Sequence, residues 1–541
     1  MGVYLNSSNG YTLYKNEISK PYFVDKSGML GELVPLVKEG SNYICITRPR
    51  RFGKTIAANM IGAFFARGQD SRPLFGGLKI SGMEGYAESI NQYHVIHIPF
   101  NETPDGCGSY QRYISRINGR LLRDLKYAYP EVEAVQGEAI WDVLYDIYEF
   151  AGRERFIFVL DEWDYIFHQD YVTQKEKKEF LGFLTNLLKD KPYVSLAYMT
   201  GILPIAKYSS GSELNMFLEF TMAGEERFDD YFGFTETEVD MLYSRYLNLV
   251  SRPKVSREGI REWYDGYHIR SGGRVYNPRS VVASLTNNNL GNYWTSSGPY
   301  DEISFYVKRN VAEVQADLAF MVSGTPVRAK IQEYAAVSMD LQTREEIFSA
   351  MVVYGFLSYC DGYVSIPNKE LMGKFGDMLK KEPSLGYINR LARESERMLQ
   401  ATLAGDTETM AQILAYAHNT ETPLLSYNNE AELAAVVNLV YLAARDCYRV
   451  EREDRAGTGY AVFIFYPREE GADSIILELK IGHTPQEAIA QIKEKQYAMR
   501  LVGKMGEKRR YPGRILMVGI CYDKKSKKHS CKIELFSGFG M

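Results

Sequence analysis

The chain has 541 residues, of which 45% are hydrophobic and 24% are charged, and its formal net charge is −4. This balance excludes wholesale disorder, and the length suggests roughly three to four domains. An acidic chain has no overall field that attracts nucleic acid, so any such attraction must come from a local patch.

The cysteines and the apolar runs indicate the compartment. The six cysteines are scattered, with no CxxC pair and no zinc-type spacing, which predicts reduced thiols in a reducing compartment. The segment Met1–Lys15 has no apolar signal core. The apolar run Ala434–Ala444 is about half of what a membrane span needs. We therefore expect a cytoplasmic protein with no membrane partner.

The first 235 residues predict a tail followed by an α/β domain. Residues 1–20 are polar and rich in Asn, Ser and Gly, which predicts a tail or turn. Over residues 21–235, short apolar runs alternate with helical stretches, as in a parallel sheet with helices on both faces. The predicted strands are Tyr43–Thr47, His94–Ile98, Arg155–Leu160 and Val194–Tyr198.

Two further regions follow along the chain. Helical periodicity dominates residues 236–425, which we expect to form a helical lid or linker. Its predicted elements are helices at Glu236–Leu249, Val311–Phe320, Arg344–Val353 and Ile388–Leu403 and a short strand near Tyr363–Ile366. Residues 426–541 predict a smaller α/β domain. Its elements are helices Glu430–Asp446 and Pro485–Leu501, strands Tyr460–Tyr466, Ser474–Leu479 and Arg514–Cys521, and a turn at Gly457–Gly459.

A candidate phosphate-binding loop lies between the first predicted strand and the helix Ile56–Ala66. The loop Arg48–Thr55 ends in Gly-Lys-Thr, and in a P-loop the backbone N–H groups and the helix N-terminus hold phosphate oxygens. Lys54 would reach the β- and γ-phosphates of ATP, and Thr55 would bind Mg²⁺. Arg48 stands where the first glycine is expected, and a lysine that merely opens a surface helix is the competing interpretation.

A second signal strengthens this interpretation. The predicted strand that ends at Leu160 is followed by Asp161 and Glu162. Asp161 could hold the Mg²⁺ and its waters, and Glu162 could activate a water for attack on the γ-phosphate. Asp164 is a possible helper, although carboxylates after a strand also simply cap the next element. Thr200 is either a polar sensor near the γ-phosphate or a helix N-cap.

A second candidate site lies in the C-terminal region. Glu478 and Lys480 are two residues apart on a predicted strand, so they share one face. A carboxylate and an amine on one face can serve metal-dependent phosphodiester hydrolysis, although a solvated strand face gives the same pattern. The following helix places Gln491 and Lys495 on one face at a spacing of four residues.

The C-terminal region is locally basic. Residues 481–541 contain 13 Lys/Arg against 5 Asp/Glu. The run Lys508–Arg510 and the segment Lys524–His529 could contact the phosphate backbone of DNA. A solvated hairpin tip is the alternative for such lysine clusters.

Taken together, these motifs resemble those of an AAA-ATPase-like family, found mainly in bacteria, whose members carry a PD-(D/E)XK nuclease domain at the C-terminus. The resemblance covers nearly the whole chain. It is carried by Phe23–Ser27, Arg48–Thr55, Leu160–Asp164, Thr200–Leu203, Phe232–Glu236, Trp263–Tyr267, Val275–Pro278, Gly457–Tyr460, Phe463–Pro467, Ile476–Lys480, Ala488–Tyr497 and Val518–Asp523. Arginine at the position of Arg48 is normal in this family.

The resemblance implies a P-loop NTPase domain, a helical middle and a C-terminal restriction-endonuclease-like α/β domain. It implies that ATP and Mg²⁺ are held around Arg51, Phe52, Gly53, Lys54, Thr55, Asp161, Glu162 and Thr200. It places Glu478, Lys480 and Gln491 on the nuclease motif, with Glu478 as a metal ligand and Glu432 as a further acidic position.

One position departs from the nuclease pattern. The motif needs a metal-binding Asp on the first strand of the domain, and the alignment places Val462 there. Valine has no oxygen to offer Mg²⁺. Either metal-dependent cleavage is severely reduced, or a carboxylate displaced from this position substitutes for the missing ligand.

Three functions remain open at this point. The leading one is an ATP-binding and ATP-hydrolysing protein coupled to a nuclease-like, nucleic-acid-binding domain with a degraded metal site. The second is an active, ATP-gated DNA nuclease, and the third is an ATP-switched binding protein with no nucleic-acid role. AAA-like ATPases often form rings, so a homo-oligomer is a further expectation, with Arg227 as one candidate arginine finger.

Overall fold

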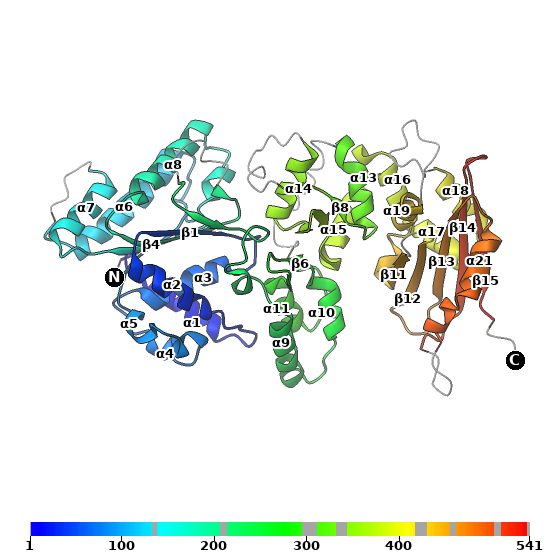
Figure 1. Cartoon of the computed structure of the whole chain (residues 1–541), viewed down its shortest axis with the longest axis horizontal. Helices are drawn as coiled ribbons and strands as arrows, with labels where there is room; N and C mark the ends of the chain where they lie inside the picture. Colours follow the sequence, from blue (N-terminus) through cyan, green and yellow to red (C-terminus); the bar gives the residue numbers. More distant parts are fainter. Residues whose placement is uncertain are drawn as a thin grey trace.

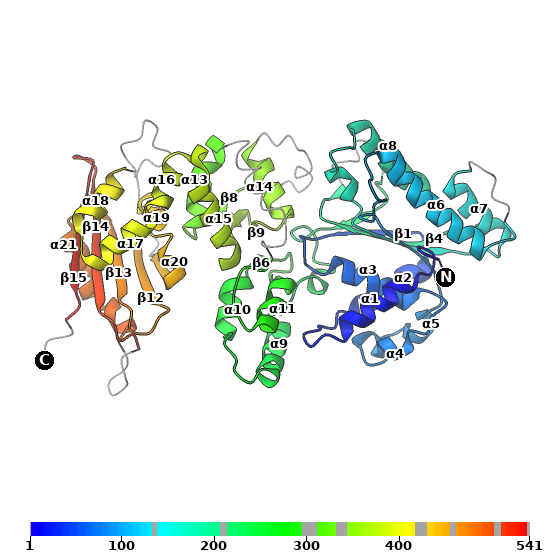
Figure 2. The same ribbon diagram turned by 180° about the vertical axis from the view of Figure 1, so that it is seen from behind.

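The computed structural model describes nearly all of the chain. The described residues are 2–132, 138–205, 214–294, 311–331, 343–416, 430–454, 461–502 and 510–537. An N-terminal α/β unit, a mainly helical middle and a C-terminal sheet follow one another along the long axis of the molecule (Figures 1 and 2). No helix in these ranges is long and apolar enough to cross a membrane.

A five-stranded parallel sheet forms the N-terminal unit. The strand order is β2-β3-β4-β1-β5, and every neighbouring pair is parallel. The strands are β1 (Asn42–Thr47), β2 (His94–Pro99), β3 (Phe156–Asp161), β4 (Val194–Gly201) and β5 (Leu218–Phe220). The four predicted strands are thus confirmed, whereas the short edge strand β5 escaped prediction.

Helices cover both faces of this sheet, as the sequence predicted. One face packs against α6 (Tyr110–Ala128), α7 (Ile140–Phe150) and α8 (Gln174–Leu188), and the other packs against α2 (Gly28–Glu39) and α3 (Lys54–Phe65). Alternate residues of one strand enter the two cores, because strand side chains alternate between faces. The carboxyl ends of β1 and β3, which carry the predicted site, are thereby fixed at one edge of the sheet.

The N-terminal segment corrects the prediction of a tail. Helix α1 (Ser8–Ile18) begins at Ser7, whose side chain accepts a hydrogen bond from the backbone N–H of Asn9. Tyr14 is buried between α1 and the rest of the domain and stacks on Phe75 at 5.4 Å. Polar composition concealed this helix because only one narrow face of it is buried.

The middle region is mainly helical, as predicted. Its helices are α9 (Glu236–Leu249), α10 (Arg257–Tyr264), α11 (Pro278–Asn287), α13 (Val311–Val322), α14 (Arg344–Val353), α15 (Lys369–Lys381), α16 (Tyr387–Arg393), α17 (Ser395–Ala404) and α18 (Thr407–Tyr416). The single helix predicted at Ile388–Leu403 is two helices, because the chain turns between Arg393 and Ser395. Small strands accompany them as β6 (Tyr267–His268), β7 (Arg274–Val275), β8 (Val327–Arg328), β9 (Ser358–Cys360) and the predicted β10 (Tyr363–Ser365).

The C-terminal region is a mixed sheet of order β11-β12-β13-β14-β15. The strands are β11 (Tyr448–Asp454), β12 (Ala461–Pro467), β13 (Ser474–Ile481), β14 (Ile515–Asp523) and β15 (Lys528–Leu535). Only β13 and β14 pair in parallel, and α21 (Pro485–Glu494) connects them. The sequence did not predict β11 or β15, and the turn predicted at Gly457–Gly459 lies outside the described residues.

The two faces of this sheet pack against different helices. Val462 and Ile476 share a core with Ile489 of α21. Leu477 belongs instead to the core that contains α19 (Glu430–Val440) on the opposite face. Since Glu478 lies in phase with Ile476, it faces the side of α21.

Candidate functional sites

The loop after β1 has the form of a P-loop. Gly53 has φ +94°, a left-handed conformation that favours glycine, and α3 begins at the next residue. The Lys54 ammonium donates hydrogen bonds to the backbone carbonyls of Arg48 and Pro49, both at 2.9 Å. Burial lowers the pKa of Lys54 to about 8, although nearby carboxylates raise it. The lysine therefore lies across its own loop, where a phosphate would replace the two carbonyls.

Arg48 takes the place of the first P-loop glycine, and its side chain turns away from the loop. The buried guanidinium donates to the carbonyls of Thr47 at 2.9 Å and Phe220 at 2.8 Å. It also pairs with Asp229 at 3.2 Å. Arg48 thus ties β1 to β5, and its backbone alone is left to line the loop.

Two further loop residues point in different directions. Arg51 has φ +71°, and burial together with the charges of Arg279 and Arg50 lowers its pKa. Phe52 is 1% exposed, and its ring packs edge-on against Tyr267 of the middle region at 5.0 Å. The loop therefore offers cations on one side and an apolar contact with the middle region on the other.

Asp161 ends β3 near the phosphate-binding loop. It is 2% exposed, and its Oδ1 atom has no hydrogen-bond partner within the described part of the chain. Burial and the charge of Glu162 raise the pKa of Asp161 to about 6, while the Thr55 hydroxyl and Lys54 lower it. A hydroxyl beside a carboxylate with a spare oxygen fits Mg²⁺, which prefers oxygen ligands.

Asp164 stabilises the backbone beside this site. Asp164 is buried and accepts hydrogen bonds from the backbone N–H groups of Ile202 at 3.0 Å and Leu203 at 2.9 Å. Burial raises the pKa of Asp164, but these bonds and His168 outweigh burial and lower the pKa overall. The carboxylate suggested as a catalytic helper is therefore engaged in holding the chain after β4.

Thr200 lies inside β4, between β1 and β3. It is paired with Ile46 on one side and Asp161 on the other. Its hydroxyl donates to the Ile46 carbonyl at 2.8 Å, so the N-cap interpretation is wrong. Arg227, the candidate finger, donates to Glu32 of the same chain at 3.1 Å.

The C-terminal candidate residues meet on β12 and β13. Val462 is directly opposite Glu478 in the strand register, so the two side chains share a face. The Lys480 ammonium lies 4.0 Å from the Glu478 carboxylate. Neither oxygen of Glu478 has a hydrogen-bond partner among the described residues, and burial raises its pKa to about 8 against the charges of Lys480 and Lys495.

The remaining nuclease-motif residues lie around this pair. Gln491 is partly buried on α21, one turn before Lys495 at the end of that helix. The backbone of Glu432 is in α19 on the other face of the sheet, and its side chain lies outside the described residues. In the described ranges no group of three His, Cys, Asp or Glu is placed to hold a metal ion.

The basic segments of this domain are only partly described. Lys508 and Arg509 lie outside the described residues, while Arg510 is exposed beside Tyr511. The segment at Lys524 forms the exposed turn between β14 and β15. The position fits a solvated hairpin tip as well as a phosphate contact.

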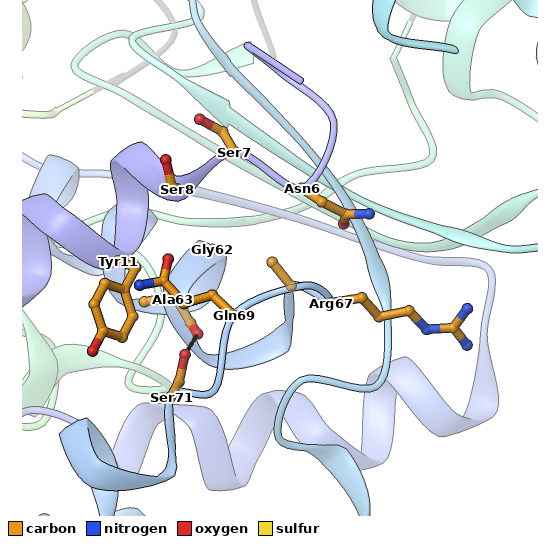
Figure 3. Close-up of a pocket in the computed structure, with 10 residues that line it drawn as sticks. Asn6, Ser7, Ser8, Tyr11, Gly62, Ala63, Arg67, Gln69 and Ser71 are labelled. Atoms are coloured by element: carbon orange, nitrogen blue, oxygen red, sulfur yellow. Dashed lines mark hydrogen bonds between the residues drawn. The ribbon is translucent and has the colours of Figure 1, made fainter. Parts of the chain in front are cut away.

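A small pocket lies at the far end of α3 from Lys54 (Figure 3). It is lined by Asn6, Ser8, Tyr11, Gly62 and Ser71, among others, and its volume is about 10 Å³. That volume holds about one water molecule. The pocket is therefore no candidate for a nucleotide site.

Comparison with protein families matches the two sites to two known domains. Residues 13–210 match the family described as "Predicted AAA-ATPase". Residues 428–530 match the PD-(D/E)XK nuclease superfamily. This chain joins an AAA-ATPase-like domain to a PD-(D/E)XK nuclease-like domain. The first match contains Lys54 and Asp161 and the second contains Glu478 and Lys480, so the predicted domain types are confirmed.

Two individual proteins are also similar to this chain. This chain is 28% identical over 286 residues to a protein of Azotobacter chroococcum mcd 1 described as "Uncharacterized protein in vnfD 5'region". The match covers 51% of each chain, so this chain spans about half the length of that curated relative. A Walker-type ATPase of Pyrococcus abyssi superposes with a TM-score of 0.37 and 13% identity, over 64% of this chain and 94% of that one.

Two contacts around the AAA-ATPase-like site could not be predicted from local sequence patterns. Gly355 has no Cβ, and a Cβ built there would lie 2.6 Å from Pro49. Arg279 opens α11 and raises the positive potential at Arg51. Both residues come from the middle region, about 230 to 300 positions downstream of the loop, so local motifs could not place them.

Proposed function

We propose that this protein binds and hydrolyses ATP at the loop after β1 and transmits the nucleotide state to a nuclease-like, nucleic-acid-binding domain. The carrying observation is that Lys54 begins α3, after the loop that follows β1, and that Asp161 ends the nearby strand β3. β4 lies between β1 and β3 and carries Thr200 next to its last residue. Phosphates held by α3 would lie between a cation and a carboxylate that can hold Mg²⁺.

Each residue has a defined task in this proposal. Lys54 leaves its two backbone carbonyls and binds the β- and γ-phosphates. Thr55 and Asp161 supply the oxygens that hold Mg²⁺, which would neutralise charge on the phosphates. Glu162, partly exposed next to Asp161, orients and deprotonates the attacking water.

The contact with the middle region supports the proposed coupling. Phe52 packs on Tyr267, and its carbonyl accepts a hydrogen bond from the backbone of Gly233 at 3.3 Å. Pro49 packs on Gly355 at a distance that excludes any side chain there. Movement of Lys54 away from the Pro49 carbonyl would therefore be felt by the middle region.

The C-terminal domain is proposed to bind nucleic acid without cleaving it efficiently. Val462 occupies the position opposite Glu478 where the nuclease motif has an Asp. It packs in an apolar core with Ile464 and Ile489, so the residue at this position supplies no oxygen to a metal ion. A single buried carboxylate beside Lys480 holds a divalent cation poorly.

The test measures plasmid nicking and cleavage of single-stranded DNA with Mg²⁺ or Mn²⁺, with and without ATP. Wild type is compared with Val462→Asp and Lys480→Ala, and ATP hydrolysis is followed in the same samples. We expect ATP hydrolysis in all three and cleavage only by Val462→Asp. Cleavage by wild type that is lost in Lys480→Ala would overturn the degraded metal site, and absent ATP binding would overturn the ATPase assignment.

A further inference from the structure

Helix α6 carries a basic outer face that neither proposed site uses. Its cations are Arg112, Arg116, Arg120, Arg123 and Lys126, and its one acid is Asp124. Asp124 is buried, and its carboxylate accepts hydrogen bonds from the backbone N–H groups of Tyr4 at 2.6 Å and Leu5 at 3.1 Å. With 3.6 residues per turn, the cations lie opposite the buried Ile117 and Leu121.

Most of these cations have no ion-pair partner. Arg120 lies 3.8 Å from Glu102. Arg112 donates to the carbonyls of Asp105 and Gly106 rather than to a carboxylate. Across the described ranges, no carboxylate lies within 4.0 Å of the charged groups of Arg112, Arg116, Arg123 or Lys126. Like charges four residues apart destabilise a helix, so α6 maintains this face at some cost in stability.

Two buried donors beside this face lack acceptors. The Tyr4 hydroxyl and the Arg116 Nε have no hydrogen-bond partner among the described residues. Tyr4 is 1% exposed. Burial raises the pKa of Tyr4, and the charges of both Arg120 and Arg116 (which lower it) and Glu102 and Asp124 (which raise it) act on the hydroxyl. Buried donors without acceptors are costly.

We propose that the outer face of α6 binds the phosphate backbone of a single-stranded nucleic acid. Cations four residues apart lie about 6 Å apart along the helix axis, so the face offers a regular row for a repeating polyanion. Tyr127 adjoins the row and is 79% exposed, which gives a flat ring on which a base can stack. An acidic protein partner would also match the row of cations, but it would not need an exposed aromatic ring beside them. This surface is additional to the C-terminal domain and to the ATP site.

The experiment measures binding of the full chain to a fluorescent single-stranded DNA or RNA oligonucleotide by anisotropy over a range of KCl concentrations. The test variants are Arg123→Gln/Lys126→Gln and Tyr127→Ala. Because α8 carries exposed lysines on the same domain, Lys175→Gln/Lys178→Gln is the control with the same change of net charge. Lys524→Gln/Lys525→Gln tests the C-terminal turn separately.

We expect the α6 double variant to bind about tenfold more weakly and to lower the logarithmic salt slope by about 1.4, since each phosphate contact in a single strand contributes about 0.7. Tyr127→Ala should weaken binding about tenfold with little change in slope, because stacking is not screened by salt. The α8 control should bind like wild type, and unchanged ATP hydrolysis and thermal melting would show that each variant is folded.

Several outcomes would overturn this proposal. They are unchanged affinity and slope in the α6 variant, an equal loss in the α8 control, or equally strong competition by poly-glutamate. Absence of nucleic-acid binding by wild type would also overturn it. If Lys524→Gln/Lys525→Gln alone removed all binding, the α6 surface would be excluded while the proposed function of the C-terminal domain would stand.

Discussion

At the scale of single residues, Lys54 and Asp161 show opposite pKa shifts with one physical cause. Burial favours the neutral form of any ionisable group. It therefore lowers the pKa of Lys54 to about 8 and raises that of Asp161 to about 6. A bound partner of opposite sign would move both pKa values back toward their usual range, which is the arrangement expected of a phosphate and cation site.

Removal of either charge should disable the ATP site without unfolding the domain. Lys54→Ala and Asp161→Asn should each lower the rate of ATP hydrolysis by about 10²–10³-fold, the usual loss when one electrostatic contact to a developing charge is removed. Steady-state phosphate release measures the rate. Lys175→Ala on the exposed face of α8 is the control, and hydrolysis at the wild-type rate in both site variants would exclude this site.

His97 makes the stability of the N-terminal domain depend on pH. Burial lowers its pKa from 6.5 to about 4, so the unfolded chain binds more protons than the folded one between these values. Stability is therefore fully present above pH 6.5 and falls as the pH drops toward 4, by up to about 3 kcal/mol. Urea unfolding at about pH 5 and about pH 7 should show this loss in wild type and a smaller loss in His97→Gln. An equal loss in both proteins would contradict the assignment to His97.

At the scale of elements, the loop after β1 connects the N-terminal domain to the middle region, in addition to being the proposed phosphate-binding loop. Gly53 permits the left-handed turn that starts α3, and Phe52 leaves the loop to enter the core of the middle region. A continuous cluster of buried side chains includes Phe52, Tyr267 and Leu318, and it reaches Val518 in the C-terminal sheet. A change in the loop therefore has a packed route toward the other sites.

Shortening the side chain of Phe52 should uncouple ATP binding from the response of the middle region. In wild type we expect ATP to change hydrogen exchange at α11 and α14. Phe52→Ala should retain ATP binding but lose this change. Because a Phe→Ala cavity costs about 3–5 kcal/mol, Phe52→Leu is the companion variant and should show an intermediate response. A full response in both variants would contradict a role for Phe52 in transmission.

The elements also show where local patterns succeed. Apolar runs such as Phe156–Leu160 predicted central strands because both of their faces are buried. The strands missed were edge strands: β5 has an exposed Leu218, and β15 is mostly half-buried. Edge strands bury only one face or less, so their sequences lack the continuous apolar run that identifies central ones.

At the scale of the whole molecule, the middle and C-terminal parts share an apolar core and are also joined by an ion-pair cluster of Glu262, Lys369 and Arg468. Glu262 of α10 accepts hydrogen bonds from Arg468 at the end of β12, at 2.5 and 3.3 Å. Lys369 lies 3.6 Å from the same carboxylate. These two cations outweigh the effect of burial and lower the pKa of Glu262.

A double-mutant cycle should measure the coupling energy between Glu262 and Arg468. Glu262→Gln and Arg468→Gln should show a coupling of about 1 kcal/mol, because both side chains are partly exposed and the pair is screened. Urea unfolding of the full chain gives the values, and the Asp473–Arg514 pair inside the C-terminal domain is the control. Coupling near zero would mean that the shared apolar core alone holds the two parts together.

The sequence by itself determined the two domain types and the candidate site residues, because the Gly-Lys-Thr loop, the Asp161–Glu162 pair and the Glu478–Lys480 pair are local patterns whose spacing places their own side chains. Only the tertiary structure decided what surrounds them. From its place in the motif, Arg48 could have been a phosphate contact. In the structure its guanidinium instead donates hydrogen bonds to β1 and β5. The contact of Phe52 with Tyr267 and the pairing of Val462 with Glu478 depend on strand register and domain packing. Such contacts join residues distant in sequence, and no local pattern encodes them.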